Sequence, residues 1–351
     1  MKTLSIALFA LGATACVGPD DLFVEVEQEA TGGDSCSDYF CGKGNSDVID
    51  NMGLHDLNVN GLVNSTGFRL TKAVKDGIVF QLQVYGSELT GQEINGNAYL
   101  TPDEVVGAVL TVKNATSGIT YEIQIADRVK SLYWATIDGV PKQATSYQLL
   151  WKAPNTRWQN LCVEPPLPGS DDLRGGQPAF NAFLFEGDRI NAGKKTFSDT
   201  IEDGWFNIGC MGHALAKLHL TGHTEAAKRQ HGFPSDTVER QTFLRMIVAD
   251  YCHTGQPFTV AGQPLDYMNA STLKYVSGVS LAIEARWDKN GATCMGKART
   301  VVNPTPQSLA AFPHGVYRAM YEAGCTPPPQ CIDQDVDSLD GHYLNSANPY
   351  M

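Results

Sequence analysis

The chain has 351 residues, of which 42% are apolar and 18% charged, and its formal net charge is −12. This acidic excess argues against nucleic acid or an anionic membrane surface as an electrostatic partner. The length exceeds what a single hydrophobic core usually serves, so we expect more than one domain.

The first residues have the pattern of an export signal. Lys2 is a short basic region, residues 4–11 are an apolar core, and the small residues 13–15 precede Cys16. Residues 1–15 are therefore predicted to be a signal peptide, and residues 13–16 resemble a bacterial lipobox. That resemblance implies that Cys16 is the lipid attachment site. Because Val17 is not the Asp that marks inner-membrane retention, we expect an exported protein anchored in the bacterial outer membrane. The alternative is a plain secretory signal.

Cysteine usage predicts disulfides. Removing Cys16 from the nine cysteines leaves eight, an even number in a chain with an export signal. Short loops separate Cys36 from Cys41 and Cys325 from Cys331, which favours a local bridge in each case. The remaining candidates are Cys162, Cys210, Cys252 and Cys294.

Two folded regions are predicted after a tether. Residues 16–52 are rich in Gly, Ser and acidic residues and are expected to form a lipidated flexible tether. In residues 53–161 apolar side chains alternate, as in 78–85 and 119–125, and Asp138-Gly139 is a hairpin pattern. This region is predicted to be an antiparallel all-β sandwich or barrel.

Residues 162–325 contain both the alternating pattern of strands and the three- to four-residue spacing of helices. Short strands are expected at 180–185 and 203–208, and helices at 211–220 and 236–252. Asp236 is the expected N-cap of the second helix, with Glu239 three residues later. If Asn290 and Gly291 form a two-residue hairpin loop, Trp287 lies opposite Cys294. The fold class is therefore α+β, and residues 326–351 form a tail rich in proline and acidic residues.

Several motifs resemble the ADYC domain, a family of exported proteins from myxobacteria and their relatives. The name-giving tetrapeptide is Ala249, Asp250, Tyr251 and Cys252, and it is accompanied in order by residues 86–91, 158–162, 206–217 and 284–294. Coverage extends over about residues 75–300. The position after Lys217, often a cysteine in the family, is Leu218 here, so no disulfide pairing can be carried over. The family has no established activity, so the resemblance implies a class and a compartment.

Three candidate chemistries are weaker than their structural alternatives. Cys210, His213, His219 and His223 have spacings found in metal sites, but a helix would place the last two on the face opposite the first two, as surface histidines. Cys210 at a helix start could be a nucleophile with His253 or His314 as base. Asp333, Asp335 and Asp337 begin like a calcium loop, but Ser338 and Leu344 replace its glycine and its glutamate. We therefore predict no metal site, no cofactor and no catalytic residue.

Asp250 is predicted to have a structural role, as a hydrogen-bond acceptor or as the ion-pair partner of an arginine such as Arg299. If the two helices pack antiparallel, Cys252 meets Cys210, which leaves Cys162 for Cys294. The predicted function is that of a cell-envelope lipoprotein with a non-enzymatic binding or scaffolding role toward an unknown envelope protein or polymer. The alternative is an enzyme that acts on an envelope polymer through a cysteine or carboxylates.

Overall fold

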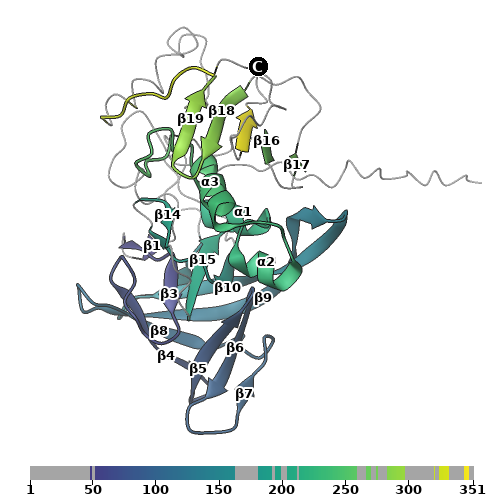
Figure 1. The fold of residues 1–351 in the computed structure, drawn as a ribbon. Helices are drawn as coiled ribbons and strands as arrows, with labels where there is room; N and C mark the ends of the chain where they lie inside the picture. Colours follow the sequence, from purple (N-terminus) through teal and green to yellow (C-terminus); the bar gives the residue numbers. More distant parts are fainter. Residues whose placement is uncertain are drawn as a thin grey trace, which may run out of the picture.

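The computed structural model describes residues 48–49, 52–162, 181–191, 194–198, 204–211, 213–258, 266–269, 274–275, 283–296, 320, 324–331 and 344–347. Antiparallel sheet dominates, and the helices lie between two sheets (Figure 1). The fold is α+β, as predicted. Cys16, Cys36, Cys41 and the 333–337 motif lie outside the described residues.

The larger sheet has eleven antiparallel strands in the order β3-β15-β12-β10-β9-β8-β4-β5-β6-β7, with β11 paired to β10. The strands are β3 (Asp56–Asn58), β4 (Phe68–Lys75), β5 (Ile78–Tyr85), β6 (Glu88–Glu93), β7 (Tyr99–Leu100), β8 (Val109–Asn114), β9 (Thr120–Ile137), β10 (Val140–Lys152), β11 (Gln159–Asn160), β12 (Ala182–Glu186) and β15 (Trp205–Cys210). Strands from both sides of the predicted boundary at residues 161 and 162 therefore pair in one sheet.

Three helices and a second sheet complete the described fold. The helices are α1 (Ala214–Leu220), α2 (Glu225–His231) and α3 (Thr237–Ile247). The second sheet has the order β17 (Lys274–Tyr275), β16 (Asp266–Asn269), β20 (Leu344–Ala347), β18 (Ile283–Asp288) and β19 (Gly291–Met295). Two short ribbons pair β1 (Val48–Ile49) with β2 (Met52–Gly53) and β13 (Ile190–Asn191) with β14 (Thr196–Phe197). Because β20 pairs with β16 and β18, part of the predicted tail belongs to the second sheet.

The large sheet curls around an interior core. The turn between β5 and β6 reaches the end of β12, where Gly86 N donates to Glu186 Oε1 at 2.9 Å and Glu186 N donates to Gly86 O at 2.9 Å. The enclosed core draws buried side chains from both ends of the strand order, including Leu57 and Leu89. The alternating pattern of residues 53–161 thus predicts the inner face of this sheet, as in a barrel.

A second core lies where the helices cover the outside of the sheet. Strand β12 is buried on both faces, with Leu184 in the interior core and Phe183 and Phe185 packed under the helices. Helix α3 lies between α1 and strands β18 and β19 (Figure 1). Both faces of α1 are therefore covered, and all seven of its residues are buried.

Two predicted turns differ in outcome. The hairpin at Asp138-Gly139 is confirmed, because both residues have positive φ (52° and 73°) and connect β9 to β10. At the second hairpin the loop is Lys289-Asn290, so the predicted opposition of Trp287 and Cys294 is wrong. Asp288 Oδ1 accepts the N–H groups of Asn290 and Gly291, which turns the chain one residue early. An irregularity between Arg286 and Trp287 then places Arg286 opposite Cys294 and Trp287 opposite Ala292.

The predicted helix starts and ends are corrected in part. Asp236 is the N-cap of α3, and its side chain accepts from Glu239 N at 2.7 Å, as predicted. The helix, however, ends at Ile247 and not at Cys252. Helix α2 was not predicted, although Thr224 caps its start and Gly232, with φ 79°, caps its end.

Candidate functional site

The Ala-Asp-Tyr-Cys tetrapeptide forms a turn beyond α3. Ala249 has a left-handed φ of 50°, its N–H donates to Met246 O, and Asp250 N donates to Arg245 O at 2.9 Å. These two bonds are the Schellman pattern, in which a left-handed residue closes the helix. The apolar pattern that predicted a helix as far as residue 252 includes residues of this turn. They are apolar because they are buried in the turn, although they are not helical.

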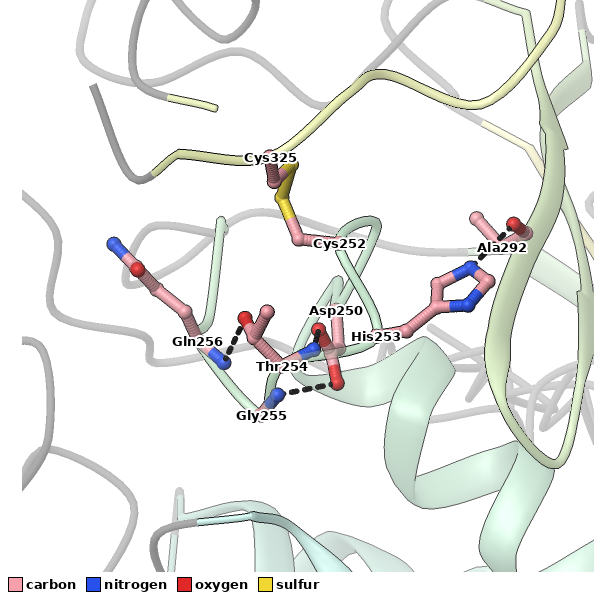
Figure 2. Close-up of a disulfide and its surroundings, with 8 residues drawn as sticks. All are labelled: Asp250, Cys252, His253, Thr254, Gly255, Gln256, Ala292 and Cys325. Atoms are coloured by element: carbon pink, nitrogen blue, oxygen red, sulfur yellow. Dashed lines mark hydrogen bonds between the residues drawn. A yellow bond between two sulfur atoms is a disulfide. The ribbon is translucent and has the colours of Figure 1, made fainter. Parts of the chain in front are cut away.

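Asp250 fixes the path of the chain after this turn. Its carboxylate is fully buried and contacts the Arg245 guanidinium. It also accepts from Thr254 N at 3.0 Å and Gly255 N at 2.8 Å (Figure 2). This is the structural role predicted for Asp250, with Arg245 as the arginine. Arg299 lies outside the described residues. The carboxylate oxygens point into the loop that they organise.

The next residues connect the turn to the second sheet and to the C-terminal part of the chain. The Tyr251 hydroxyl donates to Glu284 at 2.5 Å, and its ring lies 5.3 Å from that of Trp287. Cys252 is bonded to Cys325, and His253 Nε2 lies 2.9 Å from Ala292 O (Figure 2). The turn therefore joins α3 to β18, to β19 and to residues near 325.

The predicted pairings of Cys210 with Cys252 and of Cys162 with Cys294 are wrong. The structure pairs Cys162 with Cys210, Cys252 with Cys325 and Cys294 with Cys331, at Cα separations of 5.3, 5.6 and 5.0 Å. The prediction assumed that the helix carries Cys252 toward the start of α1. Cys210 instead ends β15 and lies with Cys162 in the interior core. Cys252 and Cys325 pack against the second core, outside the curled sheet. The local bridge between Cys325 and Cys331 is likewise replaced by two long-range ones.

Because Cys210 is bonded to Cys162, its sulfur can serve neither as the metal ligand nor as the nucleophile considered from the sequence. A bonded sulfur is neither a thiolate ligand nor a nucleophile. Within the described ranges, no group of three or more His, Cys, Asp or Glu residues is arranged to hold a metal ion.

The histidines predicted to lie on the surface are buried. His219 contacts the Tyr133 hydroxyl through Nε2 and Thr224 Oγ1 through Nδ1, both at 2.9 Å, and it stacks on Phe185. His223 stacks on Phe243 at 3.8 Å. Burial lowers the pKa of each to about 3, so both rings are neutral at physiological pH. Polar residues are expected at the surface, so the sequence did not indicate that these two are buried. His219 lies on α1, which is covered on both faces, and the Phe243 ring of α3 covers His223.

A buried ion network holds α2 and α3 against the sheet, and sequence reasoning missed it. Arg240 lies 3.1 Å from Asp188 and 3.1 Å from Glu225, and Asp188 Oδ2 accepts from Glu225 N at 2.6 Å. Burial raises the pKa of Asp188, and the charge of Arg240 opposes that shift. The three residues come from distant segments, so no local motif could have indicated this network.

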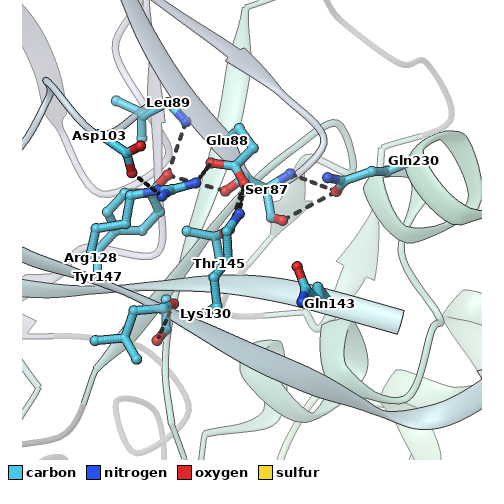
Figure 3. Close-up of polar contacts among 12 residues, drawn as sticks. Ser87, Glu88, Leu89, Asp103, Arg128, Lys130, Gln143, Thr145, Tyr147 and Gln230 are labelled. Carbon is cyan, nitrogen blue, oxygen red and sulfur yellow. Dashed lines mark hydrogen bonds and ion pairs between the residues drawn. The ribbon is translucent and has the colours of Figure 1, made fainter. Parts of the chain in front are cut away.

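A second polar cluster connects β6 to β9 and β10 near the turn between β5 and β6 (Figure 3). Glu88 pairs with Arg128 at 2.6 Å and Lys130 at 2.5 Å, and it accepts from Thr145 at 2.7 Å. Burial opposes ionisation of Glu88, but these hydrogen bonds outweigh burial and lower its pKa. The N–H and hydroxyl of Ser87 both donate to Gln230 Oε1 at 3.2 Å, which connects the turn to α2.

An open hollow of about 480 Å³ lies between β4 and β5. The two strands pair only where Ala73, Val74 and Lys75 meet Phe80, Val79 and Ile78. Beyond those pairs β4 follows β8 and β5 follows β6, so the strands separate. The charged residues that line the hollow are Arg69 and Lys72, which have the same sign and cannot form an acid–base pair with each other.

The fold and its polar clusters define a disulfide-bonded, mainly antiparallel α+β protein in which buried ionic groups join distant segments. A family model described as the ADYC domain matches residues 102–301, more than half of the chain. The chain belongs to the ADYC domain family. The match begins after residues 86–91, so that turn lies outside it. Comparison with curated proteins and with solved structures finds no match.

Among the described residues, no helix is both long enough and apolar enough to cross a membrane.

Proposed function

We propose that this protein is an exported cell-envelope lipoprotein, acylated at Cys16 and anchored to the bacterial outer membrane, with a binding or scaffolding role. The observation that carries this proposal is that all six cysteines in the described part of the chain are in disulfides. Disulfides persist in oxidising compartments and are rare where thiols are kept reduced. The signal-like residues 1–15 and the lipobox-like residues 13–16 point to the same compartment.

The use made of the charged groups favours binding or scaffolding over catalysis. Asp188 and Asp250 each bind an arginine and also accept backbone N–H groups, and Glu88 receives three donors. In each case the carboxylate holds distant segments together. The hollow between β4 and β5 offers two cationic side chains beside apolar ones, a lining suited to recognising a segment with acidic and apolar side chains.

The test starts from the tagged full chain expressed in its own host. We expect it to fractionate with the outer membrane, to resist extraction by 1 M salt, and to show a diacylglyceryl and an acyl group on Cys16 by mass spectrometry of the N-terminus. Cys16→Ser should release the protein from the membrane with unchanged thermal unfolding. Partners that co-purify with the wild-type protein would identify what it binds. A mature N-terminus with an unmodified Cys16 would contradict the lipid anchor.

A further inference from the structure

The hollow between β4 and β5 is positively charged in an acidic protein. Arg69 and Lys72 are exposed, and within the described ranges neither side chain has an ion-pair or hydrogen-bond partner. Among the residues that the structure describes, no carboxylate lines the hollow. The lining residues that matter for binding are Arg69, Leu70, Lys72, Val79, Leu82 and Ile94. The hollow therefore favours an anionic occupant.

The same lining is apolar next to the two cations. Leu70, Phe80 and Leu82 are buried and form the floor, whereas Val79 is 38% and Ile94 48% exposed. Phe80 is the one aromatic lining residue and is covered, so no exposed ring is available to stack on a sugar. Beyond Phe80, β5 has no ladder partner on the side facing β4, so an extended segment can add to that edge, whereas the facing edge of β4 is covered where Asn64 N donates to Phe68 O at 2.8 Å. These features fit an extended peptide with acidic and apolar side chains.

A segment with this composition lies near the start of the chain. Residues 22–29 read Leu-Phe-Val-Glu-Val-Glu-Gln-Glu. Val24 and Val26 alternate with Glu25 and Glu27, so in an extended conformation the valines face one side and the two carboxylates face the other. The segment has no basic residue. Its charge and its apolar side chains complement those of the hollow.

The described chain also begins beside this strand pair. Thr66, two residues before β4, donates through Oγ1 to Gly53 O at 2.5 Å, so the β1–β2 ribbon lies at the start of β4. Residues 30–47 connect the segment to that ribbon and number 47 − 30 + 1 = 18. A flexible chain of this length has an r.m.s. span of roughly 20–25 Å. The segment can therefore reach the hollow of its own chain.

We propose that residues 22–29 bind in the hollow of the same chain as an added extended segment. Glu25 and Glu27 pair with Arg69 and Lys72 on the exposed face, and the valines, which face the other way, contact the floor formed by Leu70 and Leu82. The consequence for orientation rests on the proposed lipoprotein function. Since Cys16 and Leu22 are six residues apart, docking would hold the β4–β5 face close to the membrane. The docking itself does not require the lipid.

The test is hydrogen exchange by mass spectrometry on the mature chain exported by its own host. We expect the amides of residues 22–29 to exchange at least tenfold more slowly in the wild type than in Arg69→Glu/Lys72→Glu. Salt at 1 M should remove much of this protection, because it screens exposed charges. Adding Glu25→Lys/Glu27→Lys to the double variant should restore protection. Lys289→Glu, in the remote β18–β19 turn, is the matched control and should leave protection unchanged.

Two results would overturn the proposal. One is wild-type exchange of residues 22–29 at the rate of an unstructured peptide, with β9 and β10 still protected. The other is protection that rises with protein concentration, which would assign the hollow to a second copy. The N-terminal mass, read from the same sample, reports acylation separately, so failure of docking is distinguishable from failure of the lipoprotein function.

Discussion

Asp250 illustrates how a single buried carboxylate can determine a turn. It receives two backbone N–H groups and the Arg245 guanidinium while fully shielded from water. A buried charge is tolerated when it is paired and hydrogen-bonded, but losing one partner leaves the other uncompensated. The tetrapeptide that names the family is therefore explained by folding: its aspartate directs the chain so that Tyr251 and Cys252 meet their partners.

Asp250→Asn should destabilise the protein by about 3–5 kcal/mol, because it strands the Arg245 charge in the interior. Urea unfolding followed by tryptophan fluorescence measures the effect. The matched control is Asp103→Asn, which breaks the contact between Arg128 and a side chain that is 88% exposed. An exposed pair contributes about 1 kcal/mol or less. Similar effects of the two substitutions would contradict the role given to Asp250.

The buried histidines predict a dependence of stability on pH. In the folded protein burial lowers the pKa of His219 and His223 to about 3, whereas an unfolded histidine titrates near about 6.5. A lowered folded-state pKa means that the stabilisation is complete above pH 6.5 and is lost as the pH falls toward 3. Each ring can contribute a slope of about 1.4 kcal/mol per pH unit in that window.

We expect His223→Gln to flatten the decline in the free energy of unfolding between pH 7 and pH 4. Urea titrations at several pH values measure it. His231→Gln is the comparison, because that ring is only partly buried and contacts Gln143 O. It should change the slope less. Parallel curves for the wild type and His223→Gln would show that the ring does not remain neutral in the fold.

At the scale of elements, α1 packs close to β15 because Gly209 has no side chain. A Cβ at Gly209 would lie 2.8 Å from the backbone nitrogen of Ala216. Backbone cannot move aside as a flexible side chain can, so the helix itself would have to shift. The same strand places Cys210 in the interior core one residue later. The contact between β15 and α1 thus positions the helix and the disulfide together.

Gly209→Ala should lower stability by about 1–3 kcal/mol, since overpacking at this contact displaces α1. Thermal unfolding detects the loss. Gly96→Ala is the matched control: the nearest atoms there belong to the flexible Glu93 carboxylate, which can rotate away by giving up one hydrogen bond from Ala98 N. If Gly209→Ala were as stable as the control, the close approach of helix and strand would not be structurally required.

On the scale of the whole molecule, the described chain has two hydrophobic cores that share strand β12. The curled sheet encloses one, and the helices with the second sheet enclose the other. The disulfides follow the same division, since Cys162–Cys210 belongs to the first core and Cys252–Cys325 borders the second. Cys294–Cys331 joins strand β19 to the chain near residue 331. Each bridge closes a loop of tens of residues.

Non-reducing peptide mapping should recover these three bridges and no bond between Cys325 and Cys331. Replacing Cys252 and Cys325 together by alanine should cost about 2–4 kcal/mol, because the bridge closes a separation of 73 residues. The α3–β18 region should lose hydrogen-exchange protection more than β4–β8 does. Uniform loss of protection across both cores would show that they unfold as one unit.

Local chemistry made part of this structure predictable. The alternation in residues 78–85 indicates the inner face of a curled sheet, Asp138-Gly139 forms the β9–β10 turn, and Asp236 caps α3. Each pattern depends on neighbours in sequence, through strand periodicity, a positive φ or a cap. The Ala-Asp-Tyr-Cys run correctly indicated the family.

The errors come from features that depend on distant partners. Cys252 is placed by the end of α3 and by Asp250, so its partner is Cys325 and not Cys210. His219 and His223 are polar in sequence but lie between layers that meet only in the fold. The buried network of Arg240, Asp188 and Glu225 joins residues that are far apart in the sequence. Residues 344–347, expected to belong to the tail, form a strand of the second sheet.

The sequence by itself determined the fold class, the Asp138-Gly139 turn, the Asp236 cap and the family, because period, backbone conformation and short motifs are local properties. Only the tertiary structure decided the disulfide partners, the buried state of the histidines and the hollow between β4 and β5. Those depend on which surfaces meet when two sheets and three helices pack, and sequence spacing does not contain that information.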